Sequence, residues 1–202
     1  MELYEAVRRR AMVRSFSTDP VDPGVVDRIL RAALRSPTAG NTGGTAWVAL
    51  EGPDQTAAYF DATTDHEWRN AHLEWSAGLM RAWVVLLAYS SAEAYLARYR
   101  EPDKSDSGLG DGTDLWAVPY WTGDAAFGVM VALLAAVDEG LGACILGTFR
   151  GEASLAEALG VPEDWRLFCA VALGHPDGDD RRSPSLDRPV APRPQRLHRG
   201  RW

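Results

Sequence analysis

Cysteine and lysine are scarce in this sequence, and several kinds of site are excluded with them. The 202 residues contain two cysteines, Cys144 and Cys169, which form no Cys-x-x-Cys pair and have no zinc-ligand spacing to the four histidines. Lys104 is the single lysine, and no glycine run precedes it, so a Walker phosphate loop is absent. A Gly-x-Ser-x-Gly elbow is also missing. Disulfide frameworks, hydrolytic chemistry and metal sites therefore lack support.

Long hydrophobic runs are missing as well. No apolar stretch reaches the roughly 18–20 residues that span a bilayer. Glu2 and Glu5 stand where a signal peptide would need a basic and then an apolar segment. We therefore expect a soluble, cytoplasmic protein with no membrane partner. Hydrophobic residues make up 46% of the chain and charged residues 24%, a globular composition, and the length predicts a single domain over residues 1–202.

Charge is unevenly distributed along the chain. The net charge is −7, yet residues 181–202 contain seven arginines and one aspartate. The acidic remainder disfavours non-specific binding of nucleic acid, and no aromatic stacking platform accompanies the arginines. The sequence thus predicts no nucleic-acid partner. It leaves an arginine-rich C-terminal tail that is able to serve one anionic ligand.

Hydrophobic periodicity predicts an alternation of helices and short strands. Helices are expected over residues 2–12, 54–63, 66–82, 92–99, 125–139 and 152–159, and another runs from Pro23 to a stop at Ser36-Pro37. Asp22 and Asp124 are the expected N-caps of two of them. Strands are expected over residues 46–50, 83–89, 143–147 and 167–173. This order predicts an α+β fold.

Residues 90–121 form a long irregular stretch rich in aromatic side chains. Its glycines at 108, 110 and 112 superficially resemble a dinucleotide fingerprint, but no strand precedes them and no helix opens there. Long loops of this kind are commonly functional, so the stretch is a candidate lid. Trp116, Tyr120 and Trp121 are candidates to stack on a planar substrate or nicotinamide, with Arg98 or Lys104 steering an anion. Alternatively, the aromatics pin the loop to the surface or bury in a subunit contact.

Two arginines near the N-terminus form an anion-binding pattern. Arg10 lies at the end of the first helix, and Arg14 follows where the chain straightens. Guanidiniums that converge from a helix end and an extended segment suit a ligand with two negative centres, such as a phosphate and a ring carbonyl. For Arg8 and Arg9, a favourable interaction with the helix dipole is a sufficient explanation.

Five motifs in order resemble the FMN-dependent nitroreductase family, particularly a branch that opens on Arg-x-Met-Val-Arg. The resemblance covers nearly the whole chain apart from residues 51–82. The motifs are Arg10-x-x-Val13-Arg14-x-Phe16, Ser36-Pro37-Thr38-Ala39-Gly40-Asn41, Gly140-Leu141-Gly142-Ala143-Cys144 with Gly147, Leu159-Gly160-Val161-Pro162, and Ala172-Leu173-Gly174-His175-Pro176; the His198-Arg199-Gly200-Arg201-Trp202 tail is also similar.

The resemblance implies a fold, a cofactor and an activity. The fold is a central, mostly antiparallel sheet flanked by helices in an intertwined homodimer, with two FMN sites at the subunit interface. The activity is a ping-pong reaction, in which NADH or NADPH reduces the flavin at N5 and leaves. A small electron-poor acceptor, such as a nitroaromatic or a quinone, then takes the electrons.

The resemblance also implies roles for individual residues. Arg14 would face the flavin pyrimidine edge, and the backbone of Leu146 and Gly147 would meet flavin N5, so Arg14 and Gly147 are the expected catalytic positions. The remaining cofactor-binding positions are Arg10 at the phosphate, Met12 beside it, the ring-bordering loop of Pro37, Thr38, Ala39 and Asn41, and Arg188 or Arg193 from the tail.

Two alternatives to the reductase remain open. The same flavin also suits a dehydrogenase with a dedicated substrate, such as a peptide-like natural product. A flavin-free dimer that binds a small ligand or partner is the second alternative. It is favoured by Met12, where the family often has serine, by Gly43, where it usually has glutamine, and by Val190, near its C-terminal phosphate-binding arginine.

Overall fold

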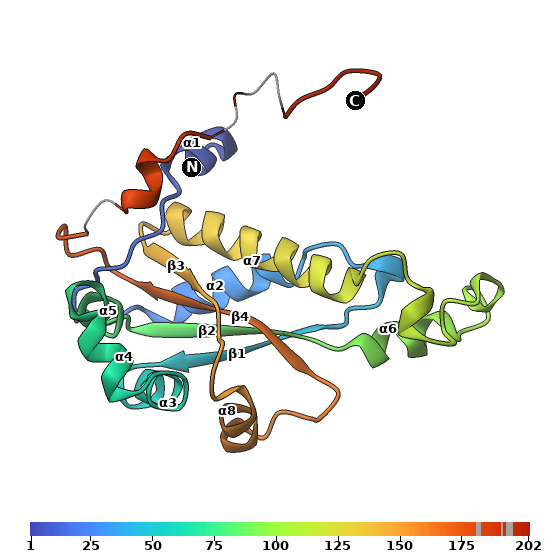
Figure 1. Ribbon diagram of the computed structural model, residues 1–202, viewed down its shortest axis with the longest axis horizontal. Helices are drawn as coiled ribbons and strands as arrows, with labels where there is room; N and C mark the ends of the chain where they lie inside the picture. Colours follow the sequence, from blue (N-terminus) through green and yellow to red (C-terminus); the bar gives the residue numbers. More distant parts are fainter. Residues whose placement is uncertain (181–182, 191, 193–195) are drawn as a thin grey trace.

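The protein is a layered α+β structure, described by a computed structural model for residues 1–180, 183–190, 192 and 196–202 (Figure 1). Its four strands form one antiparallel sheet in the order β1-β2-β4-β3. The expected α+β class with an antiparallel sheet flanked by helices is confirmed. The strands are β1 (Thr45–Glu51), β2 (Val84–Ser90), β3 (Gly142–Leu146) and β4 (Arg166–Gly174).

The helices lie on both faces of this sheet, and short 3₁₀ turns connect some of them. The α-helices are α1 (Leu3–Arg9), α2 (Pro23–Ala33), α3 (Pro53–Thr63), α4 (His66–Ala71), α5 (Leu73–Leu79), α6 (Ala92–Tyr99), α7 (Tyr120–Asp138) and α8 (Glu152–Leu159). The 3₁₀ turns are η1 (Ala39–Asn41), η2 (Ser105–Ser107), η3 (Thr113–Leu115) and η4 (Pro184–Asp187).

Strand β2 lies in the middle of the core, and all seven of its residues are buried. Alternate side chains of a strand point to opposite faces of a sheet, so an apolar run without polar interruptions fits a strand covered on both faces. Leu86 belongs to the cluster formed with α2 and α7, and Leu87 belongs to the opposite cluster with α3, α5 and α8. The sheet is therefore sandwiched between two layers of helices, as Figure 1 shows.

Helix α7 is the central helix of one layer. It packs against α1, α2 and all four strands. Among the helices that the structure describes, it is the one long and apolar enough to cross a membrane, a test that core helices of globular folds also pass. Its other face is open, since Phe127 is 53% and Met130 40% exposed.

The structure corrects two expectations about helix boundaries. Asp124 does not cap the longest helix, because α7 already begins at Tyr120 and contains Asp124 as a buried residue. Packing of Trp121 against Tyr95 and Trp116 extends the helix across Gly123. The expected helix over residues 66–82 is divided at His72, whose φ of −123° and ψ of 24° end α4 before α5 begins.

The segment after α1 runs along the edge of the sheet and places Arg14 near β3. Helix α1 ends at Arg9, earlier than expected, and Arg10 has the non-helical φ of −55° and ψ of 119°. Met12 forms a parallel bridge with Ala143 on β3, and Phe16 bridges to Pro176 just beyond β4. Arg14 is therefore fixed between two bridges, beside the exposed edge strand.

Gly151 joins β3 to α8 where the chain passes very close to α3. Its φ is +69°, and an added Cβ would lie 1.8 Å from the carbonyl oxygen of Ala62. We expect Gly151→Ala to destabilise the protein by about 3 kcal/mol, a fall in melting temperature of about 6–12 °C. Gly160 has nearly the same φ, +66°, but no atom within 4 Å of an added Cβ. Gly160→Ala should therefore lower the melting temperature much less, and equal losses would contradict the steric explanation.

Candidate functional site

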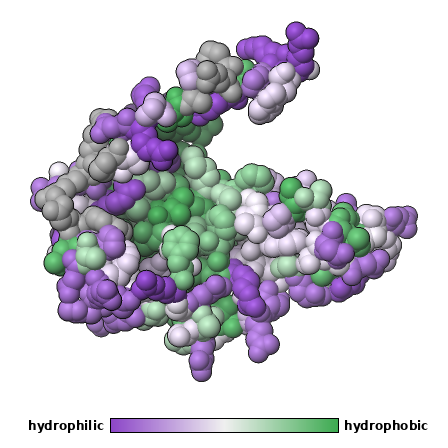
Figure 2. All heavy atoms as spheres, in the orientation of Figure 1, coloured by the Kyte–Doolittle hydropathy of each residue, from purple (hydrophilic) through white to green (hydrophobic). Residues whose placement is uncertain are grey.

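A pocket opens at the end of edge strand β3, between the sheet and the layer of α3, α4 and α5. Its volume is about 440 Å³, within the roughly 300–1,000 Å³ usual for ligand pockets. On the face of the molecule that Figure 2 shows, apolar side chains gather in the middle, with polar side chains around them. The lining residues are Arg14, Tyr59, Phe60, Thr63, Thr64, Trp68, Leu79, Cys144, Ile145, Leu146, Gly147, Phe149 and Arg150. The structure thus brings three of the expected site residues together, namely Arg14, Leu146 and Gly147.

Arg14 supplies an uncompensated positive charge to this pocket. Its Nη1 donates a hydrogen bond to the carbonyl oxygen of Met12 at 3.1 Å. No carboxylate pairs with its guanidinium among the residues that the structure describes. A half-buried guanidinium with open donors favours an anionic or electron-rich group, because its desolvation is otherwise poorly offset.

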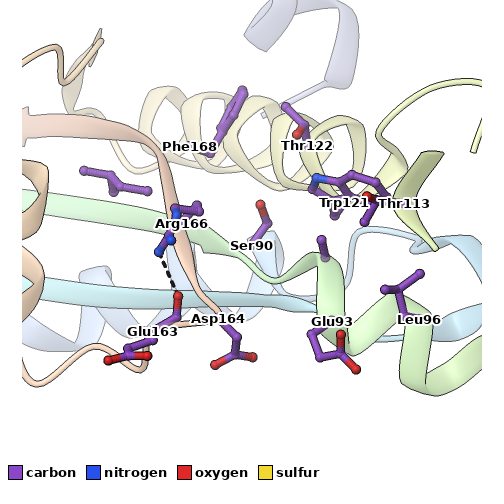
Figure 3. Close-up of a pocket in the computed structure, with 12 residues that line it drawn as sticks. Ser90, Glu93, Leu96, Thr113, Trp121, Thr122, Glu163, Asp164, Arg166 and Phe168 are labelled. Atoms are coloured by element: carbon purple, nitrogen blue, oxygen red, sulfur yellow. Dashed lines mark hydrogen bonds between the residues drawn. The ribbon is translucent and has the colours of Figure 1, made fainter. Parts of the chain in front are cut away.

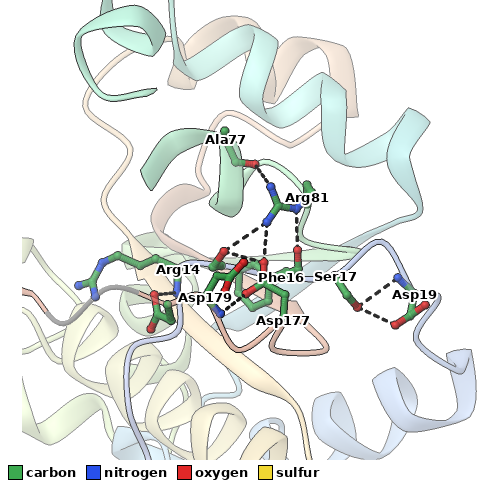
Figure 4. Close-up of polar contacts among 10 residues, drawn as sticks. Arg14, Phe16, Ser17, Asp19, Ala77, Arg81, Asp177 and Asp179 are labelled. Atoms are coloured by element: carbon green, nitrogen blue, oxygen red, sulfur yellow. Dashed lines mark hydrogen bonds and ion pairs between the residues drawn. The ribbon is translucent and has the colours of Figure 1, made fainter. Parts of the chain in front are cut away.

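A polar cluster fixes the backbone that carries Arg14 (Figure 4). Arg81 donates from Nε to the carbonyl oxygen of Phe16 at 2.7 Å and from Nη2 to Asp177 Oδ2 at 2.6 Å. Ser15 Oγ donates to the same carboxylate oxygen at 2.7 Å. The amide of Arg14 donates to Asp180 Oδ1 at 3.0 Å. The side chain of Arg14 extends away from this cluster in Figure 4, so its direction is set by bonds that leave the guanidinium free.

The Asp177 carboxylate makes the stability of the fold depend on pH. Its hydrogen bond with Ser15, the amide of Asp179 and the charge of Arg81 lower the pKa of Asp177 below the ordinary 3.8. A lowered folded-state pKa stabilises the fold above the unfolded pKa, and this contribution is lost as pH falls through the folded pKa. Asp177→Asn should therefore melt below wild type at neutral pH, with a gap that closes below about pH 4. Asp179→Asn is the control, and a gap that persists unchanged into acid would contradict this account.

The loop after β3 is fastened to α3 and α4. The hydroxyls of Thr148 and Tyr59 are 3.1 Å apart, and Arg150 pairs with Asp65. The ring of Phe149, which is 95% exposed, lies over Gly147, where an added Cβ would stand 2.7 Å from it. The backbone at Gly147 is thus held in place beside an exposed aromatic ring at the mouth of the pocket.

Neither cysteine is reactive by environment. Burial raises the pKa of the Cys144 thiol, although Arg14 opposes the shift, and raises the pKa of Cys169 to about 12. Both are buried and uncharged at neutral pH, so they act as small apolar residues.

Arg10 and Met12 lie outside the lining of the pocket. Nη1 of Arg10 is buried with no hydrogen-bond partner among the described residues. Buried donors are nearly always paired, so this atom is a candidate contact for a bound ligand. Met12 packs against both core clusters, as an apolar residue should. Arg188 is exposed after η4, and Arg193 lies outside the described residues.

The loop of Pro37, Thr38, Ala39 and Asn41 lies elsewhere, next to α6 and the start of α7. None of its residues lines the pocket of Arg14. In Figure 1, α6 stands at one end of the sheet and α4 and α5 at the other. Within one chain, the two halves of the expected flavin site are therefore separate.

The three aromatic residues expected at a substrate lie around α6 and the start of α7. Trp116 is 8% exposed, donates from Nε1 to the carbonyl oxygen of Leu109 at 2.9 Å, and packs edge-on against Tyr95 and Tyr99. Trp121 joins the same cluster, and Tyr120 is 46% exposed. This packing agrees with the alternative that the aromatic residues fix the loop to the rest of the protein. Contact of these rings with a substrate stays a prediction.

A larger pocket of about 600 Å³ lies beside Trp121, between α7 and the ends of β2 and β4 (Figure 3). Glu93, Glu163 and Asp164 border it. Its cation, Arg166, donates to the carbonyl oxygens of Glu163 and Trp165 at 2.8 and 3.2 Å. This pocket has three carboxylates and one guanidinium that is already hydrogen-bonded, so its charge disfavours an anionic cofactor. The pocket of Arg14 is therefore the better candidate for the cofactor site.

No sequence motif indicated the aromatic wall of the Arg14 pocket. Tyr59 and Phe60, which meet edge-on at 5.2 Å, come from α3, and Trp68 comes from α4. All three lie in residues 51–82, which the motifs do not cover. Trp68 had the spacing of a core residue, whereas the structure places it half-buried in the pocket lining.

An antiparallel sheet covered by helices, with a free guanidinium at the end of its edge strand, defines an α+β protein suited to an anionic ligand. Residues 7–175 match the nitroreductase family, a family of oxidoreductases. This chain therefore belongs to the nitroreductase family, as its motifs indicated.

Individual relatives agree with this assignment. A protein of Archaeoglobus fulgidus named as an NADH dehydrogenase/NAD(P)H nitroreductase is 25% identical over 214 aligned positions, which cover 100% of this chain and 99% of the relative. The fold is similar to that of a Desulfovibrio desulfuricans protein described as a nitroreductase, in complex with FMN (22% identity, 100% and 98% of the two chains, TM-score 0.68). It is also similar to nitroreductase CinD of Lactococcus lactis in complex with nicotinic acid (18% identity, 95% and 100%, TM-score 0.70).

Proposed function

We propose that this protein is an FMN-dependent oxidoreductase that takes electrons from NADH or NADPH and passes them to a small electron-poor acceptor, such as a nitroaromatic or a quinone, by a ping-pong reaction. The observation that carries the proposal is the guanidinium of Arg14, which has no carboxylate partner among the described residues and lies in one pocket with Gly147. The FMN complex of the Desulfovibrio relative supports it.

The residues present fit FMN. The orphaned Nη1 of Arg10 provides a donor for the phosphate, and Arg188 or Arg193 would add to it from the tail. Arg14 would stabilise negative charge at the pyrimidine edge, and the Leu146–Gly147 backbone would border N5. When bound, FMN supplies a ring that accepts and returns a hydride at N5. The fixed loop after β3 keeps the reacting edge open beside Phe149.

The proposed functional unit is a homodimer. The loop of Pro37 to Asn41 does not reach the pocket of its own chain, so a second copy would supply it. Exposed apolar residues on α7 and α1 offer a surface for this contact, and residues 196–202 lie away from the body (Figure 1). The exposed side chains are Leu3, Tyr4, Val7, Phe127 and Met130.

Steady-state kinetics test the proposed reaction. The FMN-loaded protein should consume NADH or NADPH continuously with a nitroaromatic or quinone acceptor, with the parallel-line kinetics of a ping-pong reaction. Oxygen-dependent dehydrogenation of an organic substrate without added nicotinamide would contradict it and favour the dedicated dehydrogenase instead.

A further inference from the structure

The loop of residues 38–44 holds two consecutive residues in the left-handed backbone region. Gly40 has a φ of 65°, and Asn41 has a φ of 53°. Asn41 is the one residue other than glycine with a positive φ in the described part of the chain. A side chain with a Cβ disfavours this region, so the conformation persists where surrounding contacts enforce it.

Asp124 supplies the first of these contacts from inside α7. Its Oδ2 accepts a hydrogen bond from the amide of Ala39 at 2.7 Å and another from the hydroxyl of Tyr95 at 2.6 Å. The residue is 3% exposed. A buried carboxylate is costly unless it is hydrogen-bonded, and these two charge-assisted bonds account for its presence.

Arg98 supplies the second contact from α6. Its Nε donates to the carbonyl oxygen of Gly40 at 2.9 Å. Asp103 accepts both of its Nη groups, at 2.6 and 2.7 Å, and Glu101 accepts Nη1 at 2.9 Å. Each of the three guanidinium nitrogens thus has an acceptor, and two carboxylates hold the charge beside the loop.

Two tyrosines of α6 press on the backbone of the same loop. A Cβ added to Gly40 would lie 2.7 Å from the ring of Tyr99, and one added to Gly44 would lie 2.5 Å from the ring of Tyr95. The side chain of Asn41, by contrast, is exposed and makes no hydrogen bond with the residues that the structure describes. The loop is therefore held through its backbone, while its amide side chain stays available.

We propose that Asp124 and Arg98 are positioning residues, which hold residues 39–41 in the conformation that presents Asn41 to the flavin of a second copy. This inference rests on the proposed function. It gives residues 90–121 a role as a buttress of the flavin site, because α6 and the start of α7 both fasten the loop.

Hydrogen exchange of the flavin-free full chain tests the buttress without relying on activity. In Arg98→Gln and in Asp124→Asn, the amides of residues 38–44 should exchange about 10–100 times faster than in wild type. Arg100→Gln is the matched control, since Arg100 also binds a glycine carbonyl, that of Gly110 at 2.8 Å, and an acid, Glu93, yet does not touch the loop. Its loop amides should exchange as in wild type.

Titration of the same variants with FMN tests the consequence for the site. Arg98→Gln and Asp124→Asn should bind FMN about 10 times more weakly, and Arg100→Gln should bind it as wild type does. Unchanged exchange in both loop variants would overturn the inference, and so would faster exchange with wild-type FMN affinity. Failure of the wild-type protein to bind FMN overturns the proposed function instead, and the exchange data still report whether Asp124 and Arg98 hold the loop.

Discussion

Replacing Arg14 by alanine is expected to lower the midpoint potential of bound FMN and to slow its reduction by NADH or NADPH about 10²-fold. A cation fixed beside the pyrimidine edge favours the form of the ring that carries negative charge there. The guanidinium of Arg14 has no carboxylate partner among the described residues, so none of them neutralises its charge in an ion pair. The measurements are a spectroelectrochemical titration and stopped-flow reduction of the flavin.

Folding should be affected much less than turnover. Within the described part of the chain, the guanidinium of Arg14 makes one hydrogen bond, to the carbonyl oxygen of Met12, whereas its backbone amide donates to Asp180. Arg14→Lys keeps the charge without the planar fork, so its flavin potential and reduction rate should lie between those of wild type and Arg14→Ala. Arg8→Ala, at an exposed position on α1, serves as the control. Unchanged reduction kinetics in Arg14→Ala would mean that the flavin ring lies elsewhere.

Arg10→Ala should weaken FMN binding about 10–100-fold, since a hydrogen bond to a charged group contributes about 1.5–3 kcal/mol. The same substitution should not destabilise the flavin-free protein. Nη1 of Arg10 is buried and has no hydrogen-bond partner in the described ranges, and an unsatisfied buried donor is destabilising. The melting temperature of flavin-free Arg10→Ala should therefore equal or exceed that of wild type.

The two measurements for Arg10 are a titration of FMN fluorescence and a thermal melt without FMN. The adjacent Arg9 is exposed and contacts only Glu5 among the described residues, at 3.5 Å. Arg9→Ala should thus change neither quantity appreciably. If flavin-free Arg10→Ala melts well below wild type and binds FMN normally, Arg10 is a structural residue and not a phosphate ligand.

The fold was predictable from the sequence where local and tertiary preferences agree. The run at 83–89 predicted a buried strand, because an apolar stretch this short with β-branched residues favours a strand over a helix. The start of α7 was not predictable, because Asp124 has the properties of a cap and Gly123 those of a helix breaker. The helix starts at Tyr120 in the structure, where Trp121 packs on Tyr95 and Trp116.

One part of the candidate site was predictable from the sequence, and the other part was not. The motifs indicated Arg14, Leu146 and Gly147 together, and the structure places them in one pocket. The wall formed by Tyr59 and Trp68 was not predictable, since those residues follow the same helical spacing as core residues. The contact of Asp124 with Ala39 was missed for a related reason: it joins positions 85 residues apart, which no local pattern reports.

The central claim is that this chain binds FMN through Arg10 and Arg14. Its most direct test is the visible spectrum of the purified protein after incubation with FMN and removal of the excess. We predict a yellow protein with flavin absorption bands, which releases on denaturation a compound with the mass of FMN. A protein that stays colourless would contradict the account and favour a flavin-free relative that binds another ligand.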